Sequence, residues 1–212
     1  MRTSCISKLM IILALLLVNE GIVRADSVFD FESDTPYDFG TNTPGTATQF
    51  SNTNNGITAT FSSPADPGGF DVYAPFGFST LIGNFLGTGQ TAPPFTPLTI
   101  AFNTDVNSIS LNFGLDESGA LTLMAFEGST LVGTMSVTGA VPSGFSLPEG
   151  IINFNGATFN SLVLDATSVD GFFGVDNVDV ATAAVPEPAT LILLGTGLLG
   201  LASARRRARF KN

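Results

Sequence analysis

Carboxylates are the side chains best able to do chemistry in the central part of this chain. Sixteen Asp and Glu residues lie between Asp26 and Asp179, and no Lys, Arg or His occurs from Asp26 to Ser203. Phosphates are normally held by Lys, Arg or helix N-termini, so binding of nucleic acid or nucleotides is disfavoured. Without histidine there is no imidazole base or ligand. The single cysteine, Cys5, precedes this stretch, so thiol and disulfide chemistry is excluded from it.

Three oxygen-bearing side chains form a candidate calcium site: Glu32, Asp176 and Asn177. Glu32 follows the opening apolar stretch Val28–Phe31, and the other two lie in the closing stretch Phe172–Val180. The first and last strands of a compact domain often lie close together, and calcium prefers oxygen ligands. Neighbouring residues of a regular strand face opposite ways, so Asp176 or Asn177 must lie at a bulge or a strand end, or contribute through its backbone carbonyl. The alternative is a set of solvated surface acids, with Asn177 in a turn.

Pairs of carboxylates could also act as the acid and base of a glycoside hydrolase. The pairs that lie near each other in sequence are Asp30 with Glu32, Asp116 with Glu117, and Asp176 with Asp179. Adjacent residues face opposite sides of a strand, so we expect Asp116 and Glu117 in a turn with Ser118 and Gly119. Among sixteen carboxylates some pair arises by chance, so catalysis is the alternative interpretation and a non-catalytic domain the main one.

Sugar binding favours exposed aromatic rings, and Tyr73 is the candidate for such a ring. The chain has no Trp, two Tyr and nineteen Phe, and the Phe residues are expected in the core. Tyr73 lies in the segment Phe70–Pro75 and is the best candidate in the chain for an exposed ring. With no basic side chain nearby in sequence, an acidic polysaccharide would be repelled unless calcium bridged it.

These residues are expected on one acidic all-β domain, residues 26–184, with the architecture of an antiparallel β-sandwich of jelly-roll type. Period-two alternation of apolar residues indicates strands, and Glu127-Gly128-Ser129 predicts a hairpin turn. No segment of this region has the pattern of a helix of three turns. The expected strands are Val28–Phe31, Ile57–Phe61, Leu98–Phe102, Ile109–Leu115, Leu121–Phe126, Thr130–Val137, Ile151–Phe154, Phe159–Leu164 and Phe172–Val180.

Residues 1–25 are expected to be a signal peptide. A basic start, Met1–Lys8, precedes the apolar run Leu9–Val18, and Val23-Arg24-Ala25 supplies a cleavage site after Ala25. The alternative is a membrane anchor, but the apolar run of ten residues is too short to span a bilayer.

Residues 185–212 form a second targeting segment. The tripeptide Pro186-Glu187-Pro188 precedes the largely apolar stretch Ala189–Ala204, and a basic cluster with Arg205, Arg206 and Arg207 follows. The apolar stretch predicts a short transmembrane helix, and the arginines are expected on its cytoplasmic side. A plain C-terminal membrane anchor is the alternative to a processed signal.

This combination of tripeptide, apolar span and terminal arginines resembles the PEP-CTERM sorting signal. The resemblance implies an exosortase-type membrane protease as partner, and a Gram-negative host that makes exopolysaccharide. Within the domain, Leu121–Thr134, Phe173–Val180 and the opening Phe29–Glu32 resemble PEP-CTERM passenger domains of the galactose-binding-like jelly-roll type.

The expected function is that of an exported, non-catalytic surface or matrix protein associated with exopolysaccharide. It would be anchored in the membrane through its C-terminus and then reach the cell surface or extracellular matrix. The alternatives are a secreted carbohydrate-active enzyme and a calcium-dependent carbohydrate-binding module.

Overall fold

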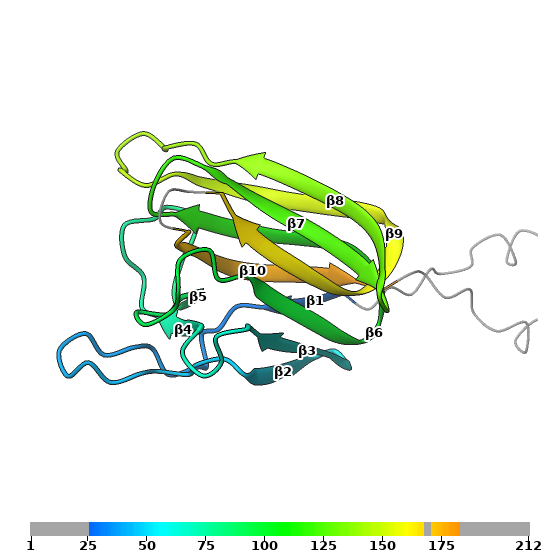
Figure 1. Cartoon of the computed structure of the whole chain (residues 1–212), viewed down its shortest axis with the longest axis horizontal. Coiled ribbons are helices and arrows are strands. Elements are labelled where there is room, and N and C mark those ends of the chain that lie inside the picture. Colours follow the sequence, from blue (N-terminus) through cyan, green and yellow to red (C-terminus); the bar gives the residue numbers. More distant parts are fainter. Residues whose placement is uncertain (1–25, 168–170, 183–212) are drawn as a thin grey trace, which may run out of the picture. The chain divides into compact units, whose positions relative to one another are not determined.

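The computed structural model describes residues 26–167 and 171–182, and this part of the chain is entirely β-structure (Figure 1). Residues Ala25–Ala183 form one compact unit. The signal peptide, residues 1–25, and the tail with Pro186, Glu187, Pro188 and Arg205–Arg207 lie outside the described residues. Within the described ranges there is no helix that is long and apolar enough to cross a membrane. The strands are β1 (Asp26–Phe29), β2 (Phe50–Asn54), β3 (Ile57–Ser62), β4 (Phe70–Tyr73), β5 (Phe85–Thr88), β6 (Leu98–Leu115), β7 (Ala120–Glu127), β8 (Thr130–Thr138), β9 (Glu149–Ala166) and β10 (Phe173–Ala181).

The antiparallel β-sandwich expected from the sequence is confirmed, and two long strands, β6 and β9, join its layers. The first part of β6, Leu98–Ala101, pairs with the end of β9. The later part, Ser108–Gly114, pairs with the beginning of β9. The register shifts between these two parts, so both strands bend from one layer into the other. Strands β3, β7 and β8 extend the first layer, and β10, β5 and β4 extend the second.

The strand lengths differ from the expectation at β6 and β9. The apolar stretches Leu98–Phe102 and Ile109–Leu115 were expected as separate strands, and they belong to one strand of 18 residues. The polar residues between them, Asn103–Asp105, are exposed and stay extended through the bend. An interrupted apolar pattern therefore marks a bend in a continuous strand here, and the same holds for β9.

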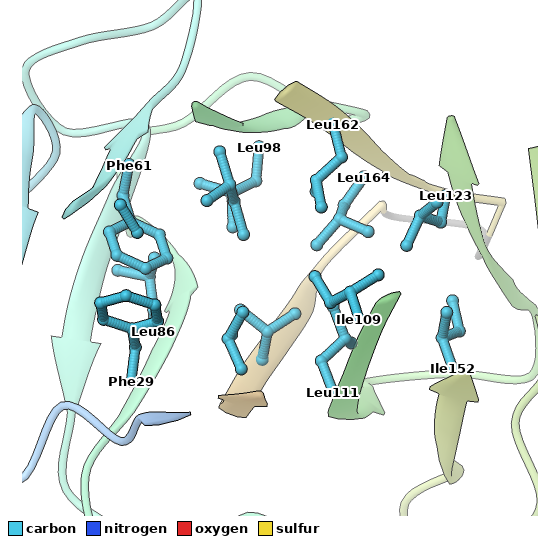
Figure 2. Packing of buried hydrophobic residues seen from close by; sticks show 14 of the residues in the cluster. Phe29, Phe61, Leu86, Leu98, Ile109, Leu111, Leu123, Ile152, Leu162 and Leu164 are labelled. Carbon is cyan, nitrogen blue, oxygen red and sulfur yellow. The ribbon is translucent and has the colours of Figure 1, made fainter. Parts of the chain in front are cut away.

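One apolar core fills the space between the layers (Figure 2). Alternate residues of the strands point into it, as the pattern of buried and half-buried residues in β3 and β7 shows. At one end the rings of Phe29, Phe31 and Phe61 meet edge to face. Full burial of each such side chain contributes on the order of 1.5–3 kcal/mol, so this core is the main source of stability.

Strand β10 lies at the centre of the second layer. On one side it pairs with β6, and on the other it pairs first with β5, at Gly174 and Val175, and then with β1, at Val178–Ala181. Asp176 and Asn177 occupy the interval between β5 and β1. The register shifts there, and Asn177 has a φ of 50°. The first and last strands therefore pair, and a bulge lies at Asp176, which is one of the arrangements that the sequence analysis allowed for a shared site.

Candidate functional site

Glu149, the first residue of β9, holds the segment between β4 and β5, which we call loop 74–84. Its side chain is only 4% exposed. One carboxylate oxygen accepts the Ser79 N–H at 2.6 Å, and the other accepts the Ser79 hydroxyl at 2.9 Å and the Thr80 N–H and hydroxyl, each at 2.7 Å. Burial acts to raise the pKa of Glu149, but these hydrogen bonds from Thr80 and Ser79 outweigh it and hold the pKa below its ordinary value.

A second carboxylate, Glu32, contacts the other end of loop 74–84. It accepts the Asn84 N–H at 3.1 Å, and the Asn84 amide donates to the Asp34 carbonyl at 3.2 Å. Gly83 has a φ of +86°, and a Cβ there would collide with the Glu32 carboxylate. Glycine at this position therefore serves both the backbone conformation and the close approach of Glu32.

The third carboxylate is Asp176, at the bulge of β10, and it is fully buried. Its two oxygens accept the Asn177 N–H at 2.7 Å and the Asn177 side-chain amide at 2.9 Å. Burial raises its pKa to about 7, the charges of Glu32 and Asp30 add to the rise, and hydrogen bonds from the Asn177 and Ile82 backbones oppose it. Asp176 is therefore poised to exchange a proton near neutral pH.

The three calcium ligands proposed from sequence thus lie near one another, but most of their side-chain oxygens already accept hydrogen bonds. Asp176 senses the charge of Glu32, and Asn177 stands at the bulge. Both Asp176 oxygens, however, already accept N–H groups, as does one oxygen of Glu32. Among the described residues no group of three Asp, Glu, Cys or His side chains is arranged to hold a metal. Calcium at Glu32, Asp176 and Asn177 stays a prediction.

The expectation that Tyr73 exposes its ring is wrong. Tyr73 is fully buried, and its hydroxyl donates to the Thr88 carbonyl at 3.1 Å. Burial raises the pKa of this hydroxyl to about 12. Four rings pack against Tyr73, with centroid distances of 5.7 Å to Tyr37, 5.8 Å to Phe39, 5.9 Å to Phe85 and 6.2 Å to Phe76. These neighbours come from separate segments, so local sequence patterns do not identify them.

The exposed rings of this cluster are Phe39 and Phe76, which we call the aromatic platform. They are 56% and 41% exposed, and their centroids lie 6.3 Å apart. Phe39 stacks on the buried Tyr73, and Phe76 lies in loop 74–84, which Glu149 holds. Exposed rings fixed by a buried ring suit the apolar face of a sugar or another flat ligand. The signal available in the sequence was a Phe-Gly pair in each of two loops.

The carboxylate pairs considered for catalysis fall in different settings. Asp116 and Glu117 lie in a bend after β6, as expected. Asp176 has no exposed surface, so its pair with Asp179 does not face a substrate. The Asp30 and Glu32 pair lies beside Asp176, where Glu32 already holds the Asn84 backbone. A hollow of about 360 Å³ is lined by Asp116, Glu117, Ser118, Val141, Ser146 and Pro148.

Comparison with known families identifies the tail. Residues 184–207 match the PEP-CTERM protein-sorting motif. This chain carries a PEP-CTERM sorting motif. The match contains Pro186-Glu187-Pro188 and Arg205–Arg207, the residues on which the resemblance rested, and it indicates an exported protein with C-terminal sorting. No curated protein sequence matches the chain.

Solved structures with a similar course of the chain include an adhesin domain and carbohydrate-binding modules. The K1 cleaved adhesin domain of Lys-gingipain from Porphyromonas gingivalis W83 is 9% identical, with 74% of this chain and 98% of that chain covered and a TM-score of 0.46. A family 6 carbohydrate-binding module is 16% identical, with coverages of 57% and 86% and a TM-score of 0.36. CsCBM6-3 from Clostridium stercorarium, in complex with cellobiose, is 16% identical, with coverages of 58% and 92% and a TM-score of 0.34. At these TM-scores the likenesses carry no argument about function.

Proposed function

We propose that this protein is an exported, non-catalytic component of the cell surface or extracellular matrix that binds exopolysaccharide. The observation that carries the proposal is the PEP-CTERM motif at residues 184–207, which begins where the compact unit Ala25–Ala183 ends. Such a motif implies processing by an exosortase-type membrane protease. The domain is then the part of the molecule delivered to the surface, and its exposed features determine what it does there.

The aromatic platform supports polysaccharide as the ligand. C–H groups of a sugar ring stack on aromatic faces. Phe39 and Phe76 are partly exposed rings with planes 89° apart, and Phe39 is fixed by stacking on Tyr73. The Tyr37 hydroxyl and the Asn42 side chain, 3.2 Å apart, place polar atoms in the same loop as Phe39. The carboxylates of the domain repel acidic polymers. We therefore expect a neutral polysaccharide.

The binding proposal is tested with residues 26–184 on a glycan array and on exopolysaccharide, with and without calcium. Replacement of Phe39 and Phe76 by Ser should abolish binding of the domain to the array and to exopolysaccharide. Replacement of Phe95, an exposed phenylalanine outside the platform, by Ser should leave it unchanged. Equal binding by the platform variant and the wild-type domain would contradict the assignment.

The sorting proposal is tested with the full chain in an exosortase-containing Gram-negative host. Replacement of Arg205–Arg207 by Ser should alter retention in the membrane or processing near Pro186-Glu187-Pro188, because the basic cluster acts as the stop. Mass spectrometry of the surface protein should show that Asn212 has been removed. An intact C-terminus on the mature protein would mean that the tail is a plain anchor.

A secreted carbohydrate-active enzyme is the second candidate, and the hollow that contains Asp116 and Glu117 is the observation that favours it. Neighbouring carboxylates in a hollow can supply an acid and a base. Incubation of residues 26–184 with the polysaccharides that the array identifies, followed by a reducing-end assay, distinguishes the two. Activity that is lost in Asp116→Asn and Glu117→Gln would establish the enzyme.

A further inference from the structure

The described sheet has four edge strands, β1, β2, β4 and β8, and the first three are bonded to another segment of the domain. The outer side of β4 is bonded to a neighbouring segment, with the Thr48 N–H on the Phe70 carbonyl at 2.9 Å and the Val72 N–H on the Thr46 carbonyl at 3.1 Å. At β2, the Asn54 amide donates to the Val28 carbonyl at 2.8 Å, which ties this strand to β1. Backbone bonds thus cover the edge of β4, and side-chain bonds of Ser27 and Asn54 link the edges of β1 and β2 to each other.

Strand β8 is the open edge. Among the described residues its hydrogen bonds run to β7 alone, through the strand pairing and through the Thr122 and Ser136 hydroxyls. Figure 1 shows β8 at the margin of its layer. A strand of nine residues with a free side presents a row of unpaired N–H and C=O groups, which is a template for another strand.

This edge carries little of the protection that proteins usually give such strands. Charged side chains and prolines are absent from β8, whose sequence is TLVGTMSVT, and its single bulge, at Val132, leaves Gly133–Thr138 regularly paired with β7. Leu131 is 53% exposed on it. The surrounding thirty residues, 119–148, hold one of the sixteen carboxylates of the domain, Glu127. The rest of the domain is therefore strongly acidic, and this hairpin is close to neutral.

The charge distribution identifies the partner that the edge fits. Two copies of a domain with sixteen carboxylates and no basic side chain repel each other over most of their surfaces. The repulsion is smallest where carboxylates are fewest, at the hairpin of β7 and β8. An antiparallel strand pair is self-complementary about a two-fold axis, so one open edge satisfies another copy of itself.

We propose that β8 pairs antiparallel with β8 of a second copy of this chain, so that one layer continues across two domains. Thr134, the central residue of β8, then lies opposite its own copy. Many copies sorted to one surface have a high local concentration, which favours such pairing. The proposal does not depend on polysaccharide binding and can fail or succeed separately from it.

The test measures self-association of residues 26–184, a compact unit with its own core, by sedimentation velocity at low and moderate salt. We expect dimers that strengthen with added NaCl, because salt screens the repulsion between carboxylates. Thr134→Glu should weaken the dimer at least about tenfold, since like charges would lie directly opposite each other.

Two further variants separate a local contact from an effect of net charge. Thr134→Lys lowers the net negative charge of the domain. If the dimer formed through any other surface, this variant should strengthen it. If the dimer forms through β8, two lysines lie opposite each other and the variant should weaken it. Thr53→Glu adds the same charge as Thr134→Glu to an exposed threonine of the covered strand β2 and should leave the dimer intact. Circular dichroism melts check that each variant is folded. A monomeric wild-type domain at both salt concentrations, or dimers that tolerate both Thr134 variants, would overturn the proposal.

Discussion

Glu149 and Asp176 are two buried carboxylates that hydrogen-bond to the same loop in opposite electrostatic settings. Glu149 receives four hydrogen bonds from two consecutive residues, Ser79 and Thr80, and its pKa is lowered. Asp176 receives its hydrogen bonds from the Asn177 side chain and from two backbone N–H groups, lies near the charges of Glu32 and Asp30, and its pKa is raised to about 7. The two regions differ in donors and neighbouring charges, and both side chains are buried.

The comparison shows that burial alone does not determine whether a carboxylate in this domain is charged. No Lys, Arg or His is available between Asp26 and Ser203, so every carboxylate there depends on N–H and O–H donors. Asp66 follows the same rule, since it accepts the Ser63 N–H at 2.8 Å and the Thr48 hydroxyl. Glu149 and Asp66 therefore fix loops through hydrogen bonds from neutral donors. In most proteins ion pairs with Lys or Arg also contribute to this role.

The largest effect is expected at Glu149. Glu149→Gln replaces a charged acceptor by an amide whose NH₂ group faces donors, so the free energy of unfolding should fall by about 3 kcal/mol. Urea unfolding of residues 26–184 measures it. The matched control is Glu127→Gln on the exposed hairpin, which should change stability by no more than about 0.5 kcal/mol. Equal losses of stability at the two positions would show that the hydrogen bonds of Glu149 to loop 74–84 contribute no more than an exposed carboxylate does.

Calcium should act on the Asp176 region and leave the Glu149 region unaffected. An ion bound only to the folded state stabilises it by about 2.7 kcal/mol at a hundredfold excess over its Kd. The melting temperature of residues 26–184 should therefore be higher with calcium than with sodium at matched ionic strength. Asp176→Ala should abolish the excess, and Glu149→Gln should retain it. Identical shifts with the two salts would exclude the site at Glu32, Asp176 and Asn177.

Asp176 should also make the stability of the domain depend on pH. Its pKa is higher in the folded than in the unfolded state, so the folded state binds more protons between about pH 4 and the folded pKa of about 7. Stability attributable to Asp176 is therefore complete at low pH and is lost as the pH rises through 7. Asp176→Asn should remove this loss, so the stability of the variant relative to the wild type should rise by about 2–3 kcal/mol between pH 5 and pH 8.

Urea unfolding across that pH range provides the measurement. Asp176→Asn keeps an acceptor for the Asn177 N–H and gives up the second hydrogen bond, so its absolute stability at pH 5 should not exceed that of the wild type. The informative quantity is the slope with pH. A variant with the same slope as the wild-type domain would show that Asp176 titrates at its ordinary value.

The smallest effect is expected from salt. Screening reduces repulsion among sixteen carboxylates, so residues 26–184 should melt at a higher temperature in moderate NaCl than in dilute buffer. Exposed charges at these separations contribute little each, and the shift should be no more than a few degrees. Equal melting temperatures would mean that the carboxylates are too dispersed to interact.

Much of the fold follows from local sequence patterns. Alternation located most of the core strands but not the short, fully buried β4 and β5, whose residues do not alternate in burial. Glu127-Gly128-Ser129 located the hairpin between β7 and β8, whose turn has Gly128 at a φ of 60°. The pairing of β1 with β10 and the bulge at Asp176 also agree with the sequence analysis. Each of these depends on residues near one another in sequence or on the closeness of the domain ends.

The features that escaped prediction depend on distant residues. Glu149 is separated from Ser79 by 70 positions, and nothing in either segment identifies the partner. Tyr73 was the candidate for an exposed ring, and the rings of Tyr37 and Phe39 that cover it belong to a segment some thirty residues away in sequence. Asn103–Asp105 look like a connection between strands, and Asn103 is held there by the distant Thr58 N–H and Gly56 carbonyl.

The central place of β10 has a mechanical consequence. The sorting tail follows β10 in the chain, so a force that reaches the domain through the tail is applied at the end of this strand. Interstrand hydrogen bonds lie perpendicular to antiparallel strands, so a pull along β10 loads its bonds to β1, β5 and β6 in shear and together. No single bond can open first, as it would if the strand were peeled from one end. A pull along β10 would therefore be resisted by three neighbouring strands at once.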